Sequence, residues 1–229
     1  MRLHLIPPAD KHIKSTIKVT GSKSESNRIL LLQALFPNVR IENSSNSDDA
    51  QVMKKGLKID KGVVDIHHAG TAMRFLTAFF ASQEGKEVLL TGSQRMTERP
   101  VKVLVDALLS LGAQISYENN EGYPPIKITG KKLTKNKVSL PANISSQYIS
   151  ALLLIAPSLE NGIELELIGE ITSVPYIKMT LALLTQMGIE NSFMNNSIKV
   201  SPKKEVENKT LVVESDWSSA SYFYSIVAL

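Results

Sequence analysis

The sequence contains no cysteine in its 229 residues. A chain without cysteine has no disulfide, no thiolate nucleophile and no zinc site built on thiolates. Long hydrophobic runs are missing too, because no apolar stretch approaches the roughly 20 residues that span a bilayer. Residues 1–11 hold two prolines, an aspartate and no long apolar block, which is not the pattern of a signal peptide. We therefore expect a cytoplasmic protein with no membrane partner.

The sequence has no large excess of basic over acidic residues. The 26 basic residues face 22 acidic ones, and this mild surplus of +4 favours anionic ligands. Four lysines gather between residues 131 and 137 without interleaved aromatic residues, which is typical of a solvated loop, so we expect no nucleic-acid partner. Two of the four histidines, His67 and His68, are adjacent, and neighbouring side chains in a strand point to opposite faces. The histidines therefore predict no metal site.

The stretch from Gly21 to Arg28 indicates an anion site. A strand-like run over residues 13–19 precedes it, and an unbroken apolar block follows over residues 29–32. A strand that turns through Gly21 into a serine-rich helix start exposes backbone N–H groups and the positive end of the helix dipole. Lys23 and Arg28 add two cations, so this turn is suited to an anion.

The same stretch does not fit a nucleotide-binding P-loop. That motif places a glycine directly before its lysine, whereas Ser22 precedes Lys23 here. A nucleoside triphosphate site is therefore not expected. A second interpretation stays open, in which Ser24 or Ser26 only caps a helix.

Four segments share one pattern, a small polar start followed by about ten mostly apolar residues. Such segments are too hydrophobic all round for surface helices, so they predict four buried helices whose polar N-termini open towards one face. The four apolar blocks cover residues 28–36, 73–81, 148–156 and 221–229.

Amphipathic helices and strands alternate with these blocks. A glycine after each amphipathic helix and an alternating run beyond it predict a helix C-cap followed by a strand. The expected helices cover residues 48–55, 101–111 and 176–187, and the expected strands cover residues 115–117, 126–129, 163–167 and 198–200. The later units repeat after roughly 75 residues, and the first is shorter by about 30, as though a hairpin between Asp60 and His67 were missing. We expect one α/β domain of three related units.

Helix N-termini at one face would bring polar and cationic side chains together, in a site for multiply anionic small molecules. A loop before residue 101 adds two arginines, and Pro175 suits the first turn of another helix. Each serine alone could be a cap and each arginine a surface ion pair, but capping does not require a cation at every repeat. The candidate residues are Lys23, Ser24, Arg28, Gly70, Thr71, Arg74, Arg95, Arg99, Ser145, Ser146, Gln147, Ser173 and Tyr176.

These residues sit in motifs that resemble 3-phosphoshikimate 1-carboxyvinyltransferase, the EPSP synthase family. The matching motifs are collinear: Gly21-Ser22-Lys23-Ser24 with Ser26-Asn27-Arg28, then Ala69-Gly70-Thr71-Ala72-Met73-Arg74, Arg95-Met96 with Glu98-Arg99-Pro100, Ser145-Ser146-Gln147, Ser173 with Pro175-Tyr176, and Asp216 with residues 218–223. The resemblance implies transfer of the enolpyruvyl group of phosphoenolpyruvate to the 5-hydroxyl of shikimate 3-phosphate, with no metal or organic cofactor. It also implies an inside-out α/β barrel type of domain, built of three βαβαββ repeats with buried helices and outer sheets.

The resemblance also assigns roles on the shikimate 3-phosphate side. Lys23 would touch both substrates and take part in proton transfer. Ser24 and Arg28 would hold the carboxylate end. The 3-phosphate would be bound by Ser145, Ser146 and Ser173, with Tyr176 beside them.

On the phosphoenolpyruvate side, the resemblance implies binding by Gly70, Arg99 and Gln147, with Arg74 nearby. Two positions depart from the family, which usually has asparagine in place of His68 and proline in place of Phe75. Without a proline at the helix start, the backbone at Gly70 is expected to be freer.

The family has two domains. Residues 1–20 would pack with a second domain that is absent from the chain, and residues 21–229 would form the substrate-binding domain, so this chain alone should not turn over. One alternative within the class is UDP-N-acetylglucosamine enolpyruvyl transferase, whose usual Lys-Asn pair and loop cysteine are missing here. Another is a non-catalytic domain that binds a phosphorylated metabolite.

Overall fold

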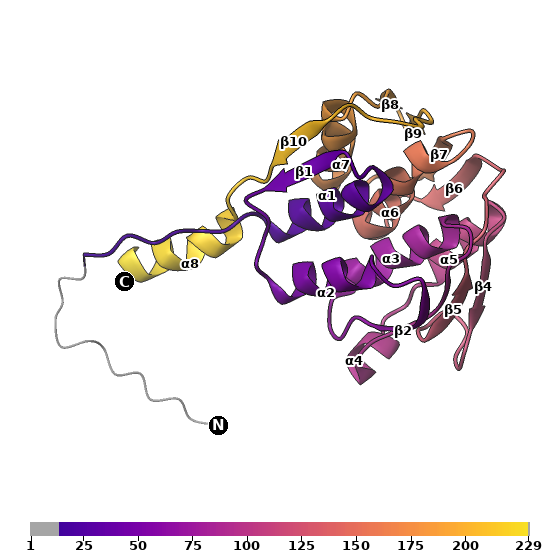
Figure 1. Cartoon of the computed structure of the whole chain (residues 1–229), viewed down its shortest axis with the longest axis horizontal. Helices are drawn as coiled ribbons and strands as arrows, with labels where there is room; N and C mark the ends of the chain where they lie inside the picture. The colour runs from indigo at the N-terminus through magenta and orange to yellow at the C-terminus, as the bar shows by residue number, and fades with distance from the viewer. Residues whose placement is uncertain (1–13, 229) are drawn as a thin grey trace.

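The computed structural model of the chain describes residues 14–228, and its body consists of helices surrounded by three sheets (Figure 1). The helices are α1 (Lys23–Leu35), α2 (Asp48–Gly56), α3 (Gly70–Ser82), α4 (Gln94–Thr97), α5 (Lys102–Ser110), α6 (Ser146–Ile155), α7 (Val174–Gln186) and α8 (Trp217–Ala228). The strands are β1 (Val39–Glu42), β2 (Lys61–Asp65), β3 (Glu87–Thr91), β4 (Gln114–Tyr117), β5 (Ile126–Thr129), β6 (Lys137–Pro141), β7 (Ile163–Ile168), β8 (Asn191–Met194), β9 (Ser197–Val200) and β10 (Lys209–Val212).

Three helices, α1, α3 and α6, form the centre of the body. α3 and α6 are apolar on nearly every side, and α1 carries an apolar block over residues 29–32, so exposing these helices would leave apolar surface in water. Each contacts the other two, and nearly every residue of α3 and α6 is buried. The more amphipathic helices α2, α5 and α7 each bury one face only. The predicted inside-out arrangement, with helices within and sheets outside, is confirmed.

The two later units have the same topology. Their sheets run in the orders β2-β3-β5-β4 and β6-β7-β9-β8. In each, a buried helix links two parallel strands, and an amphipathic helix then leads to an antiparallel hairpin. β2 begins at Lys61 and β6 at Lys137, which confirms the repeat of about 75 residues.

The first unit lacks the hairpin. α2 ends at Gly56 and β2 begins at Lys61, so no room remains between them. β1 pairs with β10, which comes from the other end of the described chain. Gln33 of α1 donates to the carbonyl of Val39 at 2.8 Å, which satisfies an acceptor of this two-stranded sheet. The predicted shortening of the first unit is confirmed.

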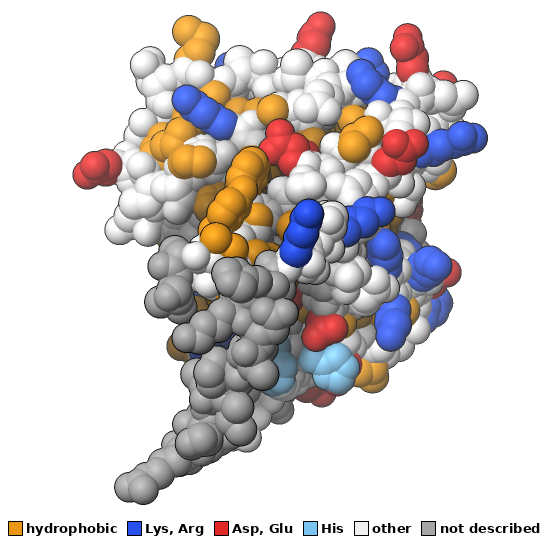
Figure 2. All heavy atoms as spheres, turned by 90° about the vertical axis from the view of Figure 1, so that its left-hand side faces the viewer, with side chains coloured by type: hydrophobic (Ala, Val, Ile, Leu, Met, Phe, Trp, Pro, Cys, Tyr) orange, Lys and Arg blue, Asp and Glu red, His pale blue; other side chains and the backbone are white. Residues whose placement is uncertain are grey.

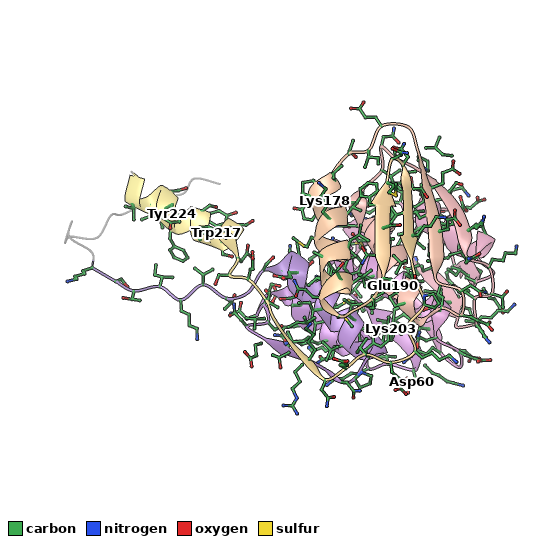
Figure 3. All side chains as sticks on the ribbon, turned by 90° about the horizontal axis from the view of Figure 1, so that it is seen from above. Asp60, Lys178, Glu190, Lys203, Trp217 and Tyr224 are labelled. Atoms are coloured by element: carbon green, nitrogen blue, oxygen red, sulfur yellow. The ribbon has the colours of Figure 1, made fainter. Side chains whose placement is uncertain are left out.

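The prediction of a fourth buried helix is wrong. α8 lies clear of the body, as Trp217 and Tyr224 show in Figure 3, and the side chains of Trp217 and Val227 are 72% and 85% exposed. In the other units, the buried helix follows the first strand of its sheet. In the first sheet, α1 packs against β1, and α8 follows β10, the other strand of that sheet. Most side chains of α8 are exposed, so no described part of the chain covers this helix.

The prediction of a strand before Gly21 is wrong for the described residues. Residue 13 lies outside them, and residues 14–20 form no ladder, because no neighbouring strand is present. Ile17 is 49% exposed. Near the body this segment contacts the start of α8, since the Asp216 N–H donates to the Thr20 carbonyl at 2.9 Å. Both segments leave the body on one side, where Figure 2 shows hydrophobic side chains at the surface.

The inner helices begin earlier than their apolar blocks suggest. α1 begins at Lys23, α3 at Gly70 and α6 at Ser146, because the small polar residues form the first turn itself. Phe75 therefore lies in the second turn of α3, not at the helix start. Within residues 14–228, no helix combines the length and apolarity needed to cross a membrane.

We predict that α8 can be removed without loss of the fold. A chain ending at Asp216 loses only this exposed helix, so its melting temperature should change by less than about 3 °C. A chain ending at Asn208 also loses β10, with the buried Leu211 and Val213, and should melt more than about 10 °C lower. Thermal unfolding followed by circular dichroism distinguishes the two, and equal losses would contradict this account of the fold.

Candidate functional site

The N-termini of four helices share one face of the body. Thr71 in the first turn of α3 accepts from Gln147 in the first turn of α6. Lys23 and Ser24, the first residues of α1, line one hollow together with Tyr176 in the first turn of α7. Arg28 of α1 also links the middle of α6 and α7, because it donates to Ser150 and Thr180. The predicted common face is therefore confirmed for α1, α3 and α6, and the start of α7 adds to it.

The helix starts differ in how they are capped. Ser22 caps α1, Ser47 caps α2 and Ser145 caps α6. By contrast, α3 begins after Ala69 and α7 after Ser173, and neither receives a side-chain cap. The first-turn N–H groups of α3 remain available to an anion, and the helix dipole favours negative charge there. In α7, Pro175 has no N–H, and the Tyr176 N–H donates to the Ser173 carbonyl at 3.1 Å.

Arg28 is a buried cation without a carboxylate. Its side chain is 2% exposed, and it donates to Thr180 Oγ1 at 2.8 Å, Ser150 Oγ at 3.0 Å and the Ser24 carbonyl at 2.8 Å. Burial lowers the pKa of the Arg28 guanidinium to about 10, so it stays charged at neutral pH. Within residues 14–228 no carboxylate forms an ion pair with it. Three of its five N–H donors are used, which leaves two for a ligand.

Arg74 and Arg99 form a second cationic group. Arg74 is 4% exposed and donates to the carbonyls of Pro100 at 2.8 Å and Gly70 at 3.2 Å. Arg99 lies over Gly70, where a methyl group would stand 3.0 Å from its Cζ, so an alanine at this position would push the end of the Arg99 side chain aside. Burial, and then the charge of Arg74, lower the pKa of Arg99. Neither arginine has a carboxylate partner in the described part of the chain, so the pair attracts an anion.

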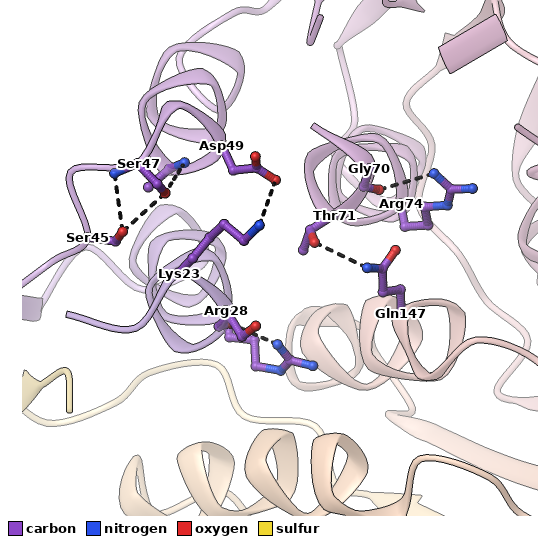
Figure 4. A network of polar contacts seen from close by, with 11 residues as sticks. Lys23, Arg28, Ser45, Ser47, Asp49, Gly70, Thr71, Arg74 and Gln147 are labelled. Carbon is purple, nitrogen blue, oxygen red and sulfur yellow. Dashed lines mark hydrogen bonds and ion pairs between the residues drawn. The ribbon is translucent and has the colours of Figure 1, made fainter. Parts of the chain in front are cut away.

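In Figure 4, Lys23 of α1 and Gln147 of α6 both extend towards the start of α3, where Gly70 and Thr71 lie. The Lys23 ammonium is 4.0 Å from the carboxylate of Asp49, and its side chain is 48% exposed. An exposed pair at this distance is weak, so Lys23 is free to turn to a ligand. Gln147 Nε2 donates to Thr71 Oγ1 at 3.3 Å, which orients the amide across the gap between α3 and α6.

Two hollows border the common face. One of about 630 Å³ is lined by Lys23, Ser24 and Tyr176 together with residues 214–219. Another of about 340 Å³ is lined by His68, Arg95, Met96 and Arg99. The candidate residues thus divide into a group beside α1 and α7 and a group beside α3, as a site for two ligands would require.

Another hollow, of about 720 Å³, lies at the opposite pole, where α1, α3 and α6 end. Lys132, Lys203 and Lys204 line it. Lysines are favourable at helix C-termini, because the carbonyl ends carry partial negative charge. The helix dipoles disfavour an anion there, so we assign no ligand to this pole.

Several residues of the site have no signal in the sequence motifs. Asp49, the partner of Lys23, could have been found only as an acidic residue in the first turn of a predicted helix. Thr180 lies one turn beyond Tyr176, but its contact with Arg28 joins positions 152 apart in the chain. Ser93 Oγ and His68 Nδ1 share a hydrogen bond of 2.7 Å, which holds the His68 ring at the edge of the smaller hollow.

Among residues 14–228, no three histidine, aspartate or glutamate side chains gather in a way that could hold a metal ion. The fold and the site together define a class of protein. It is an α/β domain of repeated units that gathers helix N-termini and buried, carboxylate-free arginines at one face, an arrangement suited to anions.

The particular family follows from comparison with known proteins. A family model for EPSP synthase (3-phosphoshikimate 1-carboxyvinyltransferase) matches residues 57–229, and the chain belongs to this family. A 3-phosphoshikimate 1-carboxyvinyltransferase of Bacteroides fragilis is 48% identical over 223 residues, which cover 96% of this chain and 54% of the relative. The counterpart of Haemophilus influenzae is 39% identical over 249 residues, which cover 95% of this chain and 57% of the relative.

Solved structures agree on the fold. The EPSP synthase of Acinetobacter baumannii matches with a TM-score of 0.75 at 22% identity, over 94% of this chain and 53% of that structure. The chain spans about half the length of the relatives it matches. The Haemophilus alignment, at 249 residues, is 20 longer than this chain, so that relative has at least 20 residues without a counterpart here. The Bacteroides alignment, at 223 residues, requires no such insertion.

We predict opposite effects on stability for Arg28 and for one of its acceptors. Thr180→Val keeps the buried charge but removes the acceptor of its Nε–H, so it should lower the free energy of unfolding by about 1–3 kcal/mol. Arg28→Met removes the charge itself, so it should stay within about 1 kcal/mol of the parent chain or exceed it. Denaturant unfolding measures both, and a larger loss for Arg28→Met than for Thr180→Val would show that the charge serves the fold.

Proposed function

We propose that this chain is the substrate-binding half of a 3-phosphoshikimate 1-carboxyvinyltransferase, a cytoplasmic enzyme that needs no nucleic-acid or membrane partner. In the reaction, the 5-hydroxyl oxygen of shikimate 3-phosphate forms a bond to C2 of phosphoenolpyruvate. The bond from C2 to the phosphate oxygen breaks, and the hydroxyl proton leaves with the phosphate. The observation that carries the proposal is the common pole of helix N-termini with buried arginines that lack carboxylates, in a chain of this family.

Shikimate 3-phosphate would bind beside α1, α6 and α7. Ser145 and Ser146 lie at the start of α6, and Ser173 and Tyr176 lie at the start of α7, so the hydroxyl groups of these residues can bind the 3-phosphate. The dipoles of both helices favour negative charge at this position. The ligand carboxylate would take the two N–H donors of Arg28 that remain free, with Ser24 next to it. A carboxylate suits this position because it supplies the charge that Arg28 lacks.

Phosphoenolpyruvate would bind at the start of α3. The uncapped N–H groups at Gly70 and the guanidinium of Arg99 face the same space, and Gln147 reaches across from α6. Arg74 would act indirectly, because its guanidinium is held against the carbonyls of Gly70 and Pro100. It would add positive charge and hold the loop that carries Arg99.

Lys23 would serve the chemical step. It stands between the two groups of ligands, so its ammonium could contact both substrates and donate or accept a proton at the reacting centre. Fixed donors and cations around it stabilise the charge that develops on the leaving phosphate, and they need no reorganisation during the reaction. Holding both polyanions in contact against their mutual repulsion is itself a large part of the task.

The proposal also requires a second half of the protein as a partner. The relatives are about twice the length of this chain, and the face formed by α8 and residues 14–20 exposes Trp217, Tyr222 and Ile17. Apolar side chains grouped in this way indicate a surface that another domain covers. The hollow beside Lys23 opens along the residues that lead into α8, so a partner docked there would close over shikimate 3-phosphate.

We predict that the chain alone does not turn over, while the complete coding sequence that contains it does. Phosphate release from shikimate 3-phosphate plus phosphoenolpyruvate is the assay, with Lys23→Ala as the control for background. The complete protein should release phosphate only when both substrates are present. Release by the 229-residue chain above its Lys23→Ala control would contradict the need for a second half. No release by the complete protein, combined with tight binding of either substrate, would favour the non-catalytic binding domain.

A further inference from the structure

The guanidinium of Arg28 lies between two aromatic rings. Its Cζ is 5.4 Å from the ring centroid of Phe75 and 5.8 Å from that of Tyr176. Phe75 comes from α3 and is fully buried, whereas Tyr176 comes from α7 and is 45% exposed. Arg28 therefore touches all three neighbouring helices: α3 through Phe75, α6 through Ser150, and α7 through Tyr176 and Thr180.

The two rings stabilise the positive charge of Arg28, which its hydrogen bonds leave without a negative partner. Every acceptor of Arg28 is neutral, so the hydrogen bonds orient the donors but leave the buried charge uncompensated. The negative face of an aromatic ring attracts a guanidinium, and this attraction is stronger when water is excluded. Phe75 makes this contact without a polar atom of its own.

We propose that Phe75 is a positioning residue for the shikimate 3-phosphate subsite, which it affects by holding the guanidinium of Arg28 in place. This inference rests on the proposed function for the identity of the ligand. The inference links Phe75 to the subsite that is farther along the site from its own helix start. Phe75 belongs to α3, whose N-terminus is assigned to phosphoenolpyruvate, yet its contact is with the arginine assigned to shikimate 3-phosphate.

Neighbouring residues of α3 thus serve different ligands. Arg74 turns towards Tyr148 and the loop that carries Arg99, with its Cζ 5.6 Å from the Tyr148 ring. Phe75, the next residue, turns towards α1 and Arg28. A change at Phe75 should therefore alter the affinity for one substrate and leave the other nearly unaffected.

The test compares two buried phenylalanines of the same helix. Phe75→Leu and Phe80→Leu each shorten a fully buried ring to an aliphatic side chain, but the Phe80 ring packs against Phe79 instead of a cation. In the complete protein, Phe75→Leu should raise the KM for shikimate 3-phosphate about tenfold and change the KM for phosphoenolpyruvate less than about twofold. Phe80→Leu should change neither. Gly70→Ala, which displaces Arg99, should raise mainly the KM for phosphoenolpyruvate.

A second readout does not depend on activity. The chain has only six arginines, so the Nε–Hε signal of Arg28 can be assigned by its loss in Arg28→Lys. In NMR spectra of the 229-residue chain, Phe75→Leu should shift this signal, because the ring above the guanidinium is lost, and Phe80→Leu should not. A complete protein that is inactive with both substrates would refute the proposed function, and the Arg28 signal would still decide whether Phe75 positions it. Equal effects of Phe75→Leu and Phe80→Leu in either readout, or a shifted Arg28 signal with an unchanged KM for shikimate 3-phosphate, would overturn the inference.

Discussion

The candidate site is organised around one buried charge. Arg28 sits where α1, α3, α6 and α7 meet, 2% exposed and surrounded by hydroxyls, a carbonyl and two rings, with no carboxylate among the described residues. Burying a cation in this way costs free energy, and a core of apolar residues would be at least as stable. The arrangement makes sense if the missing negative charge arrives with a ligand. The same contacts hold the four helices with their N-termini together, so the constraint that creates the demand for an anion also assembles the donors that meet it.

The three sheets keep the apolar helices at the centre of the body away from water. Three outer sheets cover helices that are hydrophobic on all sides, and the two later units repeat one topology. The first sheet is different, because β1 takes its partner β10 from the far end of the described chain. Both segments beside this sheet, residues 14–20 and α8, then leave the body together and expose apolar side chains. The candidate site and this exposed apolar surface therefore lie next to each other, as the proposal of a second half that closes over the substrates requires.

Local patterns in the sequence were enough to predict most of the fold. Unbroken apolar blocks predicted α1, α3 and α6, and the repeat spacing predicted the shortened first unit. The prediction failed for α8, because an apolar pattern indicates that a helix will be covered but does not say which part of the protein covers it. It failed in the same way for residues 14–19, whose alternation needs a neighbouring strand. In the site, the motifs identified the cations. The contacts of Thr180 and Phe75 with Arg28 could not be predicted, because they join distant positions of the chain.

The central claim is that helix N-termini and buried arginines, more than overall positive charge, determine where a polyanion binds. The most direct measurement is a titration of the 229-residue chain with shikimate 3-phosphate, followed by backbone amide chemical shifts. The account predicts that the largest changes occur at Ser145, Ser146 and Ser173, where α6 and α7 begin. Lysines are equally available at the opposite pole, around Lys132 and Lys203, where the helices end. Changes centred there, with none at the three serines, would contradict the account.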